Sequence, residues 1–387
     1  MLTTDYLPNI GGIAAHVYNL SHALQQLGHR VAVINPVAGE TAGLGFEGDE
    51  IPLLRVAINS EQRRFRNKIY RKHLFGLAAK EGIHAAIERF GAPHIVHQHD
   101  YQDSTSAGAA WSKRVPWVWT NHSSRFLRDY ERPMKMQYIK KSYRKVTGFI
   151  AVSEELRDKT AALWPASALA YIANGVDTAR FHDQVHVDRA AYGLQAEDVV
   201  VLCPRRMARK NGVLFLAQAV ATVLAAAPEI NWKFVFLGSE QAVNTHSDYI
   251  DEIKKLLHSE HADGRVVYLG NIPLHKMPEV NALADIVMMP SLMEAVSLSA
   301  LEAMATGAVL VASDVGGLPE IVCHEQTGLL VPPRDPAPIA TALVRLGRDP
   351  QLRDQLAAAG QQLAQDKYSW QAAAQKTLDF YRQLQNT

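Results

Sequence analysis

The amino-acid sequence predicts an α/β protein of two doubly wound domains, each a parallel sheet with helices packed against it. Short apolar runs alternate with amphipathic stretches of helical period along the whole chain, a pattern typical of βαβ units. A length of 387 residues corresponds to about two to three domains. Turn-forming residues cluster at 173–181, and we place the connection between the domains there.

The first domain is predicted to begin with a helix over 15–27, because Val17, Leu20 and Leu24 recur at helical spacing and Gly28 ends the pattern. A strand should also precede Asp5, but only four residues stand before it. We therefore expect the natural chain to begin a few residues earlier. The other strands are expected at 31–35, 94–99, 115–120 and 148–153, and further helices at 76–90 and 132–146.

The second domain repeats this alternation of strands and helices. Its strands are expected at 199–203, 233–238, 266–270, 286–290 and 308–312, with helices between them. In doubly wound sheets, ligands bind beyond the carboxyl ends of the strands. Two such domains facing each other across a cleft would bind a ligand between them.

The composition excludes several classes of protein. Apolar residues make up 48% and charged residues 20% of the chain, which excludes disordered and collagen-like proteins. Cys203 and Cys323 are the only cysteines, too few for a disulfide framework, so we expect a reducing compartment. The first residues lack the basic and apolar regions of a signal peptide, and no apolar run reaches the roughly 18 residues of a membrane span. We expect a cytoplasmic protein.

Charge is unevenly distributed between the two halves. Residues 1–180 hold 23 Lys and Arg against 16 Asp and Glu, and the remainder holds 17 against 23. The basic first half favours an acidic ligand or an anionic surface. Two stretches, 63–72 and 135–145, mix cations with aromatic and apolar residues, as do helices that lie peripherally on anionic membranes. Solvated helices and sites for an acidic sugar share this composition, and nothing else supports nucleic-acid binding.

Two carboxylates carry the strongest functional signal. Glu294 stands before a helix predicted to begin near Ser297, and Glu302 stands eight residues after Glu294, inside that helix. The amino end of a helix offers free N–H groups and a positive dipole end to an anion such as a diphosphate. Glu302 is then placed to accept hydrogen bonds from ribose hydroxyls, and Glu294 from sugar hydroxyls. Two surface carboxylates on a solvated helix would give the same spacing.

The segment from Glu294 to Glu302 resembles the Glu-x7-Glu motif of the family-four glycosyltransferases, which are retaining enzymes of the GT-B fold. The family has Glu-Gly-Phe-Gly where this chain has Glu294-Ala-Val-Ser297. The stretches at 311–322, 327–333 and 174–177 also match the family, in the right order. The resemblance implies two Rossmann-like domains, an acceptor-binding one over 1–180 and a nucleotide-sugar-binding one over 181–367. It also implies that a C-terminal helix at about 368–387 packs back on the first.

The first domain holds two further matches to the family. Gly11 and Gly12 open a helix and resemble the family's glycine loop, where the absence of a side chain lets the backbone approach the donor phosphate. His122 stands where the family places a histidine near the donor sugar.

Three other histidines of this domain are candidates: His16 follows the glycine loop, and His97 and His99 lie at a strand end. We assign His16 and His99 to acceptor binding, although His99 and its neighbour His97 would serve equally for packing at a strand end. No His or Cys spacing resembles a metal site, and no Asp-x-Asp motif for a nucleotide-bound Mg²⁺ is evident. We therefore expect neither a metal ion nor another cofactor.

Without a metal, side chains must neutralise the diphosphate. A basic loop after the first strand of the second domain resembles the family's Arg-x4-Lys-Gly loop in two registers. Aligning Gly212 selects Arg206 and puts Asn211 at the lysine position, whereas keeping the spacing selects Arg205 and Lys210. We favour Arg206 with Lys210 and assign Arg205 to donor binding.

The nucleotide base is expected to contact backbone near Asn271 and Ile272. Gly238, Ser297 and Leu298 complete the positions assigned to donor binding. Because backbone contacts leave little trace in a sequence, UDP-sugars are favoured over GDP-mannose on family frequency alone.

The predicted function is a metal-independent retaining glycosyltransferase that moves a sugar from a nucleotide-diphosphate sugar to an acceptor hydroxyl of a bacterial glycan or lipid-linked glycan. Arg206, Lys210 and helix-end amides would stabilise the departing diphosphate, while His122 and Glu294 hold the sugar. Two alternatives remain. A UDP-N-acetylglucosamine epimerase shares the fold, although the Glu-x7-Glu motif argues against it. A non-catalytic nucleotide-sugar-binding homologue would fit the altered 295–297 loop.

Overall fold

The computed structural model describes residues 1–7, 11–38, 46–47, 51–58, 68–101, 103–122, 124–238, 247–294 and 297–386. Parts of three predicted features, at 8–10, 63–67 and 295–296, lie outside the described residues. The chain divides into two compact units, each of which is described by itself. The first unit combines Met1–Gly175 with Trp370–Thr387, and the second is Val176–Ser369.

The first unit is built on a mainly parallel sheet. Its strands are β1 (Val33–Ala38), β2 (Phe46–Glu47), β3 (Leu53–Ile58), β4 (Val96–Gln98), β5 (Trp117–Asn121), β6 (Gly148–Ala151) and β7 (Ala168–Tyr171). They pair in the orders β1–β3–β2 and β4–β5–β6–β7. The pairing of β2 with β3 is antiparallel, and the other strand pairs are parallel.

Residues 1–3 join these two groups of strands. Leu2 pairs in parallel with Ile34 of β1 on one side and with Gln98 of β4 on the other. Its N–H donates to the His97 carbonyl at 2.7 Å, and its carbonyl accepts from the His99 N–H at 2.8 Å. The chain therefore runs outward from Leu2 to β1 and β3 in one direction, and from β4 onward in the other. This makes the position beside Leu2 the topological switch point of the sheet, where ligands bind in open α/β sheets.

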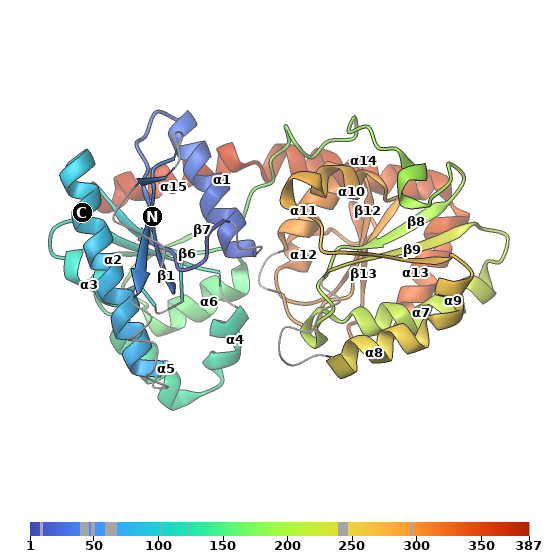
Figure 1. Cartoon of the computed structure of the whole chain (residues 1–387), viewed down its shortest axis with the longest axis horizontal. Helices are drawn as coiled ribbons and strands as arrows, with labels where there is room; N and C mark the ends of the chain where they lie inside the picture. Colours follow the sequence, from blue (N-terminus) through green and yellow to red (C-terminus); the bar gives the residue numbers. More distant parts are fainter. Residues whose placement is uncertain are drawn as a thin grey trace. The chain divides into compact units, whose positions relative to one another are not determined.

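Helices cover this sheet. They are α1 (Gly12–Gln26), α2 (Lys68–Phe90), α3 (Thr105–Trp111), α4 (Ser124–Tyr130), α5 (Pro133–Ser142), α6 (Glu154–Leu163) and α15 (Trp370–Gln385). The last of these comes from the end of the chain and packs beside α1 (Figure 1). Its Trp370 ring lies 5.1 Å from the His16 ring of α1, centroid to centroid.

The second unit contains a fully parallel sheet. Its strands are β8 (Val199–Cys203), β9 (Trp232–Leu237), β10 (Val266–Gly270), β11 (Ile286–Met289), β12 (Val309–Ser313) and β13 (Gly328–Val331). They pair in the order β10–β9–β8–β11–β12–β13. Counted within the unit this is the order 3-2-1-4-5-6 of dinucleotide-binding folds, and its switch point lies between β8 and β11.

Helices lie on both sides of this second sheet. The helices are α7 (Val213–Ala226), α8 (Ser247–Leu256), α9 (His258–Ala262), α10 (Met277–Ala282), α11 (Leu298–Ala305), α12 (Leu318–Ile321), α13 (Pro336–Arg348) and α14 (Pro350–Lys367), with short 3₁₀ turns at Arg189–Tyr192, Arg209–Asn211 and Leu274–Lys276. Figure 1 shows α7, α8 and α9 on one side of the sheet and α10, α11 and α14 on the other.

The predicted fold class, two Rossmann-like α/β domains, is confirmed, and the predicted strands agree with the structure to within a few residues. The helix expected at 132–146 is shorter in the structure, where α5 ends at Ser142. Strands β2, β3, β7 and β13 were not predicted. Arg55 interrupts the apolar run of β3, where it donates hydrogen bonds to Asn35 Oδ1 at 3.0 Å and to the Leu7 carbonyl at 2.5 Å.

Among the described residues, no helix has the length and apolar character needed to cross a bilayer.

Candidate functional site

In the second unit, an arginine and a glutamate meet at the switch point. Arg205 follows β8 and Glu294 follows β11, and the Arg205 Nη2 group forms an ion pair with Glu294 Oε2. Their side chains are only 12% and 13% exposed. The same guanidinium donates to Asn211 Oδ1 at 3.0 Å, and Asn211 Nδ2 donates to the Arg206 carbonyl at 2.8 Å. Asn211 therefore braces the basic loop.

Two glycines hold the loops that carry this ion pair. Gly212 has a φ of +67°, and a Cβ there would lie 1.7 Å from the Pro290 carbonyl oxygen, just before Glu294. Gly316 has a φ of +55°, and its Cβ would lie 1.7 Å from the Glu294 carbonyl oxygen. Left-handed backbone and such close approach both require glycine. The sequence at these positions thus fixes where the Glu294 loop lies.

The other two predicted basic residues of this loop, Arg206 and Lys210, have exposed side chains. The Lys210 carbonyl accepts a hydrogen bond from the Leu292 N–H at 2.9 Å. Of the two adjacent arginines, the structure brings Arg205 to Glu294. The assignment of Arg206 to the diphosphate stays a prediction.

The helix predicted to begin near Ser297 is α11. Ser297 is its N-cap, and its Oγ accepts a hydrogen bond from the Ala300 N–H at 3.3 Å. Leu298 is the first helical residue, so its N–H is one of the backbone groups that α11 leaves unpaired at this end. Glu302 lies half-buried one turn further along. Burial raises its pKa to about 7, and the nearby Arg180 charge opposes this shift.

The residues assigned to the base lie at the same edge of the sheet. Gly238 directly follows β9, and its N–H donates to the carbonyl of Gly270, the last residue of β10, at 2.8 Å. A Cβ on Gly238 would lie 2.6 Å from Arg206 Cα, so this turn packs on the basic loop. Asn271 is exposed and Ile272 is half-buried just beyond Gly270. The donor residues predicted in this unit therefore follow β8, β9, β10 and β11 at their carboxyl ends, as does the N-terminal turn of α11.

In the first unit, three histidines converge at the switch point. His16 lies on α1, His99 follows β4 and His122 follows β5. The His16 ring lies 4.3 Å from the His122 ring and 5.3 Å from the His99 ring, centroid to centroid. His99 Nδ1 and His122 Nε2 are 3.1 Å apart and share a hydrogen bond. We call these three residues the histidine cluster.

Residues around the histidine cluster fix its rings. His16 Nδ1 donates to Asn174 Oδ1 at 2.9 Å, which leaves Nε2 with its lone pair. His16 Nε2 is buried, and no hydrogen-bond partner for it occurs in the described part of the chain. His99 Nε2 lies 3.2 Å from Met1 Sδ.

Burial keeps the cluster uncharged. It lowers the pKa of His16 to about 4, against the opposing effect of the hydrogen bond to Asn174. It also holds the pKa values of His99 and His122 well below their ordinary range, and the charges of neighbouring histidines lower them further. At neutral pH the three rings are therefore neutral, and each has one lone pair.

The contacts of His97 agree with packing at the end of its strand. Its Nδ1 lies 2.5 Å from the Tyr381 hydroxyl of α15, and its Nε2 lies 2.6 Å from Thr120 Oγ1. Both ring nitrogens are thus engaged inside the first unit.

The glycine pair lies at the start of α1. Gly11 is the N-cap, in extended backbone, and a Cβ there would touch Asp5 Oδ2 at 3.0 Å. Among the described residues, no atom lies within 4 Å of the position that a Cβ of Gly12 would take. Gly12 opens the first turn of α1, whose N–H groups have no partner within the helix.

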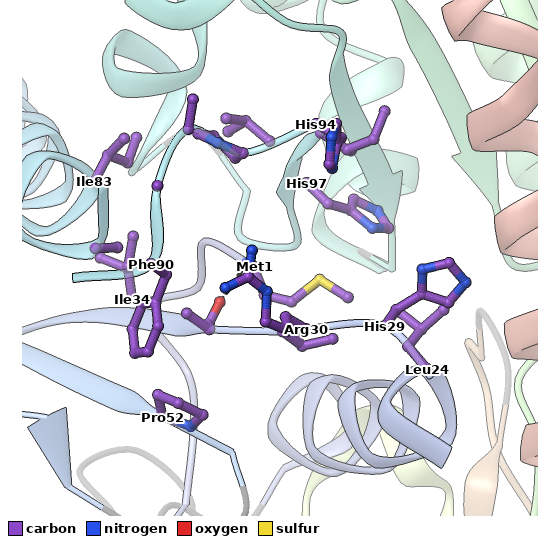
Figure 2. Close-up of a pocket in the computed structure, with 18 of the residues that line it drawn as sticks. Met1, Leu24, His29, Arg30, Ile34, Pro52, Ile83, Phe90, His94 and His97 are labelled. Carbon is purple, nitrogen blue, oxygen red and sulfur yellow. Dashed lines mark hydrogen bonds between the residues drawn. The ribbon is translucent and has the colours of Figure 1, made fainter. Parts of the chain in front are cut away.

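A separate cavity of about 730 Å³ lies at the opposite edge of the same sheet. Its walls include residues that precede the strands, such as Ala32, Pro52 and His94, together with apolar residues of α2. Figure 2 shows Ile83 and Phe90 of α2 on its wall, with Met1 and His97. Ligands of open α/β sheets bind beyond the carboxyl ends of the strands, so we assign no functional role to this cavity.

Sequence spacing could not reveal some of these contacts. Asn174 belongs to a matched family motif, but nothing in the sequence predicts that it orients His16. Trp370 is far away along the chain and reaches the histidine cluster because α15 returns to the first unit. The Arg205–Glu294 contact depends on β8 and β11 being neighbours, which the order of strands along the chain does not state.

Two family models match the chain. Glycosyltransferase Family 4 matches residues 10–180, and Glycosyl transferases group 1 matches residues 198–349. An uncharacterised glycosyltransferase of Methanocaldococcus jannaschii is 26% identical over 398 aligned residues, covering 99% of this chain and 97% of the relative. The GDP-mannose-dependent α-(1-6)-phosphatidylinositol monomannoside mannosyltransferase of Mycobacterium tuberculosis is 30% identical over 242 residues, 60% of each chain. Sucrose-phosphate synthase of Thermosynechococcus elongatus shares the fold, with a TM-score of 0.81 and 24% identity over 97% of this chain and 94% of that one.

Proposed function

Because the chain belongs to the family-four glycosyltransferases of the GT-B fold, we propose that it moves a sugar from a nucleotide-diphosphate sugar to an acceptor hydroxyl with retention of configuration. The second unit binds the donor, and the first unit binds the acceptor and contacts the transferred sugar. The observation that carries this proposal is the largely buried Arg205–Glu294 pair at the switch point of the second sheet. It places a cation and a carboxylate together where this fold binds nucleotides.

We assign roles to the residues at this edge. Arg205, with Lys210 and the free N–H groups of α11, neutralises the departing diphosphate. Glu294 accepts hydrogen bonds from the hydroxyls of the sugar, and Glu302 accepts them from the ribose. This proposal puts Arg205 in the role for which the sequence analysis favoured Arg206, and it keeps the five-residue step between arginine and lysine. It is supported by the contact of Arg205 with Glu294 and by the buried bracing position of Asn211.

The reaction balances without a further reagent. The acceptor oxygen forms a bond to the anomeric carbon while the bond from that carbon to the diphosphate oxygen breaks. The diphosphate then takes the proton of the acceptor hydroxyl. His122 positions the sugar, and His16 and His99 line the acceptor side. The diphosphate charge is met by side chains and amides, so we propose that turnover needs no metal ion.

The donor and acceptor are proposed as classes. UDP-sugars are the first choice of donor. GDP-mannose is the second, and the name of the mycobacterial relative gives it as the donor of that protein. The acceptor is a growing glycan or a lipid-linked glycan. An epimerase and a non-catalytic binder are separated from a transferase by turnover, because only a transferase releases nucleotide in proportion to acceptor glycosylated.

The test compares Arg205→Ala with Arg206→Ala, a matched pair of adjacent arginines. Thermal shift in the presence of EDTA, with UDP, GDP, ADP and their sugar conjugates, first identifies the base. A ligand at a hundred times its Kd adds about 2.7 kcal/mol to the free energy of unfolding. Loss of a charged hydrogen bond costs about 1.5–3 kcal/mol, so we expect Arg205→Ala to weaken binding of the chosen nucleotide roughly 10- to 100-fold. Arg206→Ala should change it less than about threefold, since that side chain is exposed.

If Arg206→Ala weakens nucleotide binding more than Arg205→Ala does, the diphosphate contact belongs to Arg206. Equal binding by both variants and the wild type would place the diphosphate elsewhere. A nucleotide-sugar that binds but is never turned over with glycan or lipid-linked acceptors would support the non-catalytic alternative.

A further inference from the structure

The histidine cluster has the geometry of a site for a transition-metal ion. One ring nitrogen from each of His16, His99 and His122 lies within 4.8 Å of the other two. No other group of three or more His, Cys, Asp or Glu side chains in the described ranges converges in this way. We propose that these three residues bind one Zn²⁺ ion.

The distances fit such a site. Two nitrogens on one tetrahedral Zn²⁺, each at about 2.0–2.1 Å from the ion, are roughly 3.3 Å apart. His99 Nδ1 and His122 Nε2 are already 3.1 Å apart. In the metal-free protein one of these nitrogens donates to the other, so binding requires the donor ring to move its proton to its other nitrogen. The ring stays neutral, and no proton is released.

His16 supplies the most specific evidence. Its Nδ1–H donates to Asn174 Oδ1, and its Nε2 lone pair is buried with no hydrogen-bond partner in the described part of the chain. A buried polar atom without a partner is rare and calls for an explanation. Metal-ligating histidines almost always donate their second ring N–H to an oxygen in this way, which fixes the tautomer. Asn174 is therefore the positioning residue of the proposed site.

The ligand set favours zinc. Neutral imidazoles suit Zn²⁺, Cu²⁺, Ni²⁺ and Fe²⁺ better than Mg²⁺ or Ca²⁺, which prefer oxygen ligands. Three histidines leave the fourth tetrahedral position open to water or to a hydroxyl. Such a site differs from the Mg²⁺-diphosphate sites that an Asp-x-Asp motif would indicate.

A bound ion would change the activity of the enzyme. The His122 nitrogen that ligates the ion is no longer available to the sugar. Zn²⁺ should therefore inhibit sugar transfer. This consequence rests on the proposed function, whereas binding of the ion does not.

The test measures binding and inhibition separately, on untagged full-length protein stripped with a chelator. Calorimetric titration with zinc chloride should give one ion per chain. Co²⁺, which absorbs visible light intensely when four-coordinate, should give that absorption and lose it when Zn²⁺ is added. His16→Gln should abolish binding, and Asn174→Ala should weaken it roughly 10- to 100-fold. His29→Ala, which removes an exposed histidine outside the cluster, should leave it unchanged.

The outcomes discriminate clearly. Absence of stoichiometric binding by the wild type, or equal binding by the wild type, His16→Gln and Asn174→Ala, would overturn the proposal. Circular dichroism and thermal unfolding check that His16→Gln is folded. Asn174→Ala gives an independent measurement if it is not. Binding of one ion without any effect on sugar transfer would leave the metal site established and would refute the role proposed for His122.

Discussion

The position of Glu294 should depend on the glycine beneath it, and replacing Gly316 by alanine tests this. A Cβ at Gly316 would lie 1.7 Å from the Glu294 carbonyl oxygen and 2.8 Å from its carbonyl carbon. Both neighbours are backbone atoms, so no side-chain rotation relieves the clash. Protein atoms essentially never approach a Cβ within 3.0 Å, so the backbones at positions 294 and 316 must separate by more than an ångström.

Two effects set the magnitude, and a matched variant separates them. Alanine in left-handed backbone costs about 1–2 kcal/mol, and overpacking adds about 1–3 kcal/mol. Gly264→Ala introduces only the first effect, because Gly264 has a φ of +69° and the described part of the chain places no atom within 4 Å of the new Cβ. We therefore expect Gly264→Ala to lose about 1–2 kcal/mol of stability and Gly316→Ala about 2–5 kcal/mol.

The functional loss should be larger than the loss of stability implies. A misplacement of about 1 Å in a positioning group costs roughly 100-fold in rate. Gly316→Ala, assayed well below its unfolding transition, should therefore lose about 100-fold in kcat/KM for the donor, and Gly264→Ala should stay near the wild type. Urea unfolding gives the stabilities, and nucleotide release gives the rates. Similar kcat/KM values for the two variants would refute the claim that this contact positions Glu294.

Two further predictions follow from single groups. The pKa of Glu302 lies near 7, above its ordinary value of 4.5, so the folded protein holds a proton that the unfolded chain releases. The associated stability is present below about pH 4.5 and is lost as the pH rises through about 7, by at most about 3 kcal/mol. Glu302→Gln should flatten this dependence in urea unfolding at several pH values, and parallel curves would show that Glu302 does not titrate as proposed. On α5, Met134 is 88% and Tyr138 54% exposed beside the basic residues of 135–145. If this face lies on anionic lipid, Met134→Ser should weaken co-sedimentation with phosphatidylglycerol vesicles about 10-fold. Leu256→Ser, at an exposed leucine of the second unit, should not, and equal binding by both variants would exclude α5 as the contact.

Much of the fold could be predicted because buried parallel strands are continuous apolar runs. Strands such as β8 and β12 are entirely or almost entirely buried, so their sequences show the pattern without interruption. Strand β7 is only half-buried along its length and gives a weaker signal. Strand β3 was missed because Arg55 stands in its middle, and its side chain is satisfied by Asn35 and Leu7, which no local pattern predicts.

The candidate site could be predicted in part, because some of its residues are close together in the sequence. The Glu-x7-Glu spacing lies within one loop and one helix, so Ser297 as the start of α11 and Glu302 inside it follow from local sequence. The choice between Arg205 and Arg206 does not, because adjacent residues differ only in the direction of their side chains. That direction depends on contacts with Glu294, which follows β11, and with Asn211, which lies in the 3₁₀ turn after β8.

The order of strands in the sheet explains which contacts local sequence cannot reveal. In both units the chain starts a sheet in the middle, builds outward to one side, and then returns to build the other side. The two strands at the switch point are therefore neighbours in space and distant along the chain. His16 and His99 follow Leu2 and β4 in the first unit, and Arg205 and Glu294 follow β8 and β11 in the second. In each unit, close contacts between chemically active side chains form where the chain order reverses. Local periodicity predicts the strands there but not their adjacency, so the histidine cluster and the Arg205–Glu294 pair become visible only once the sheet order is known.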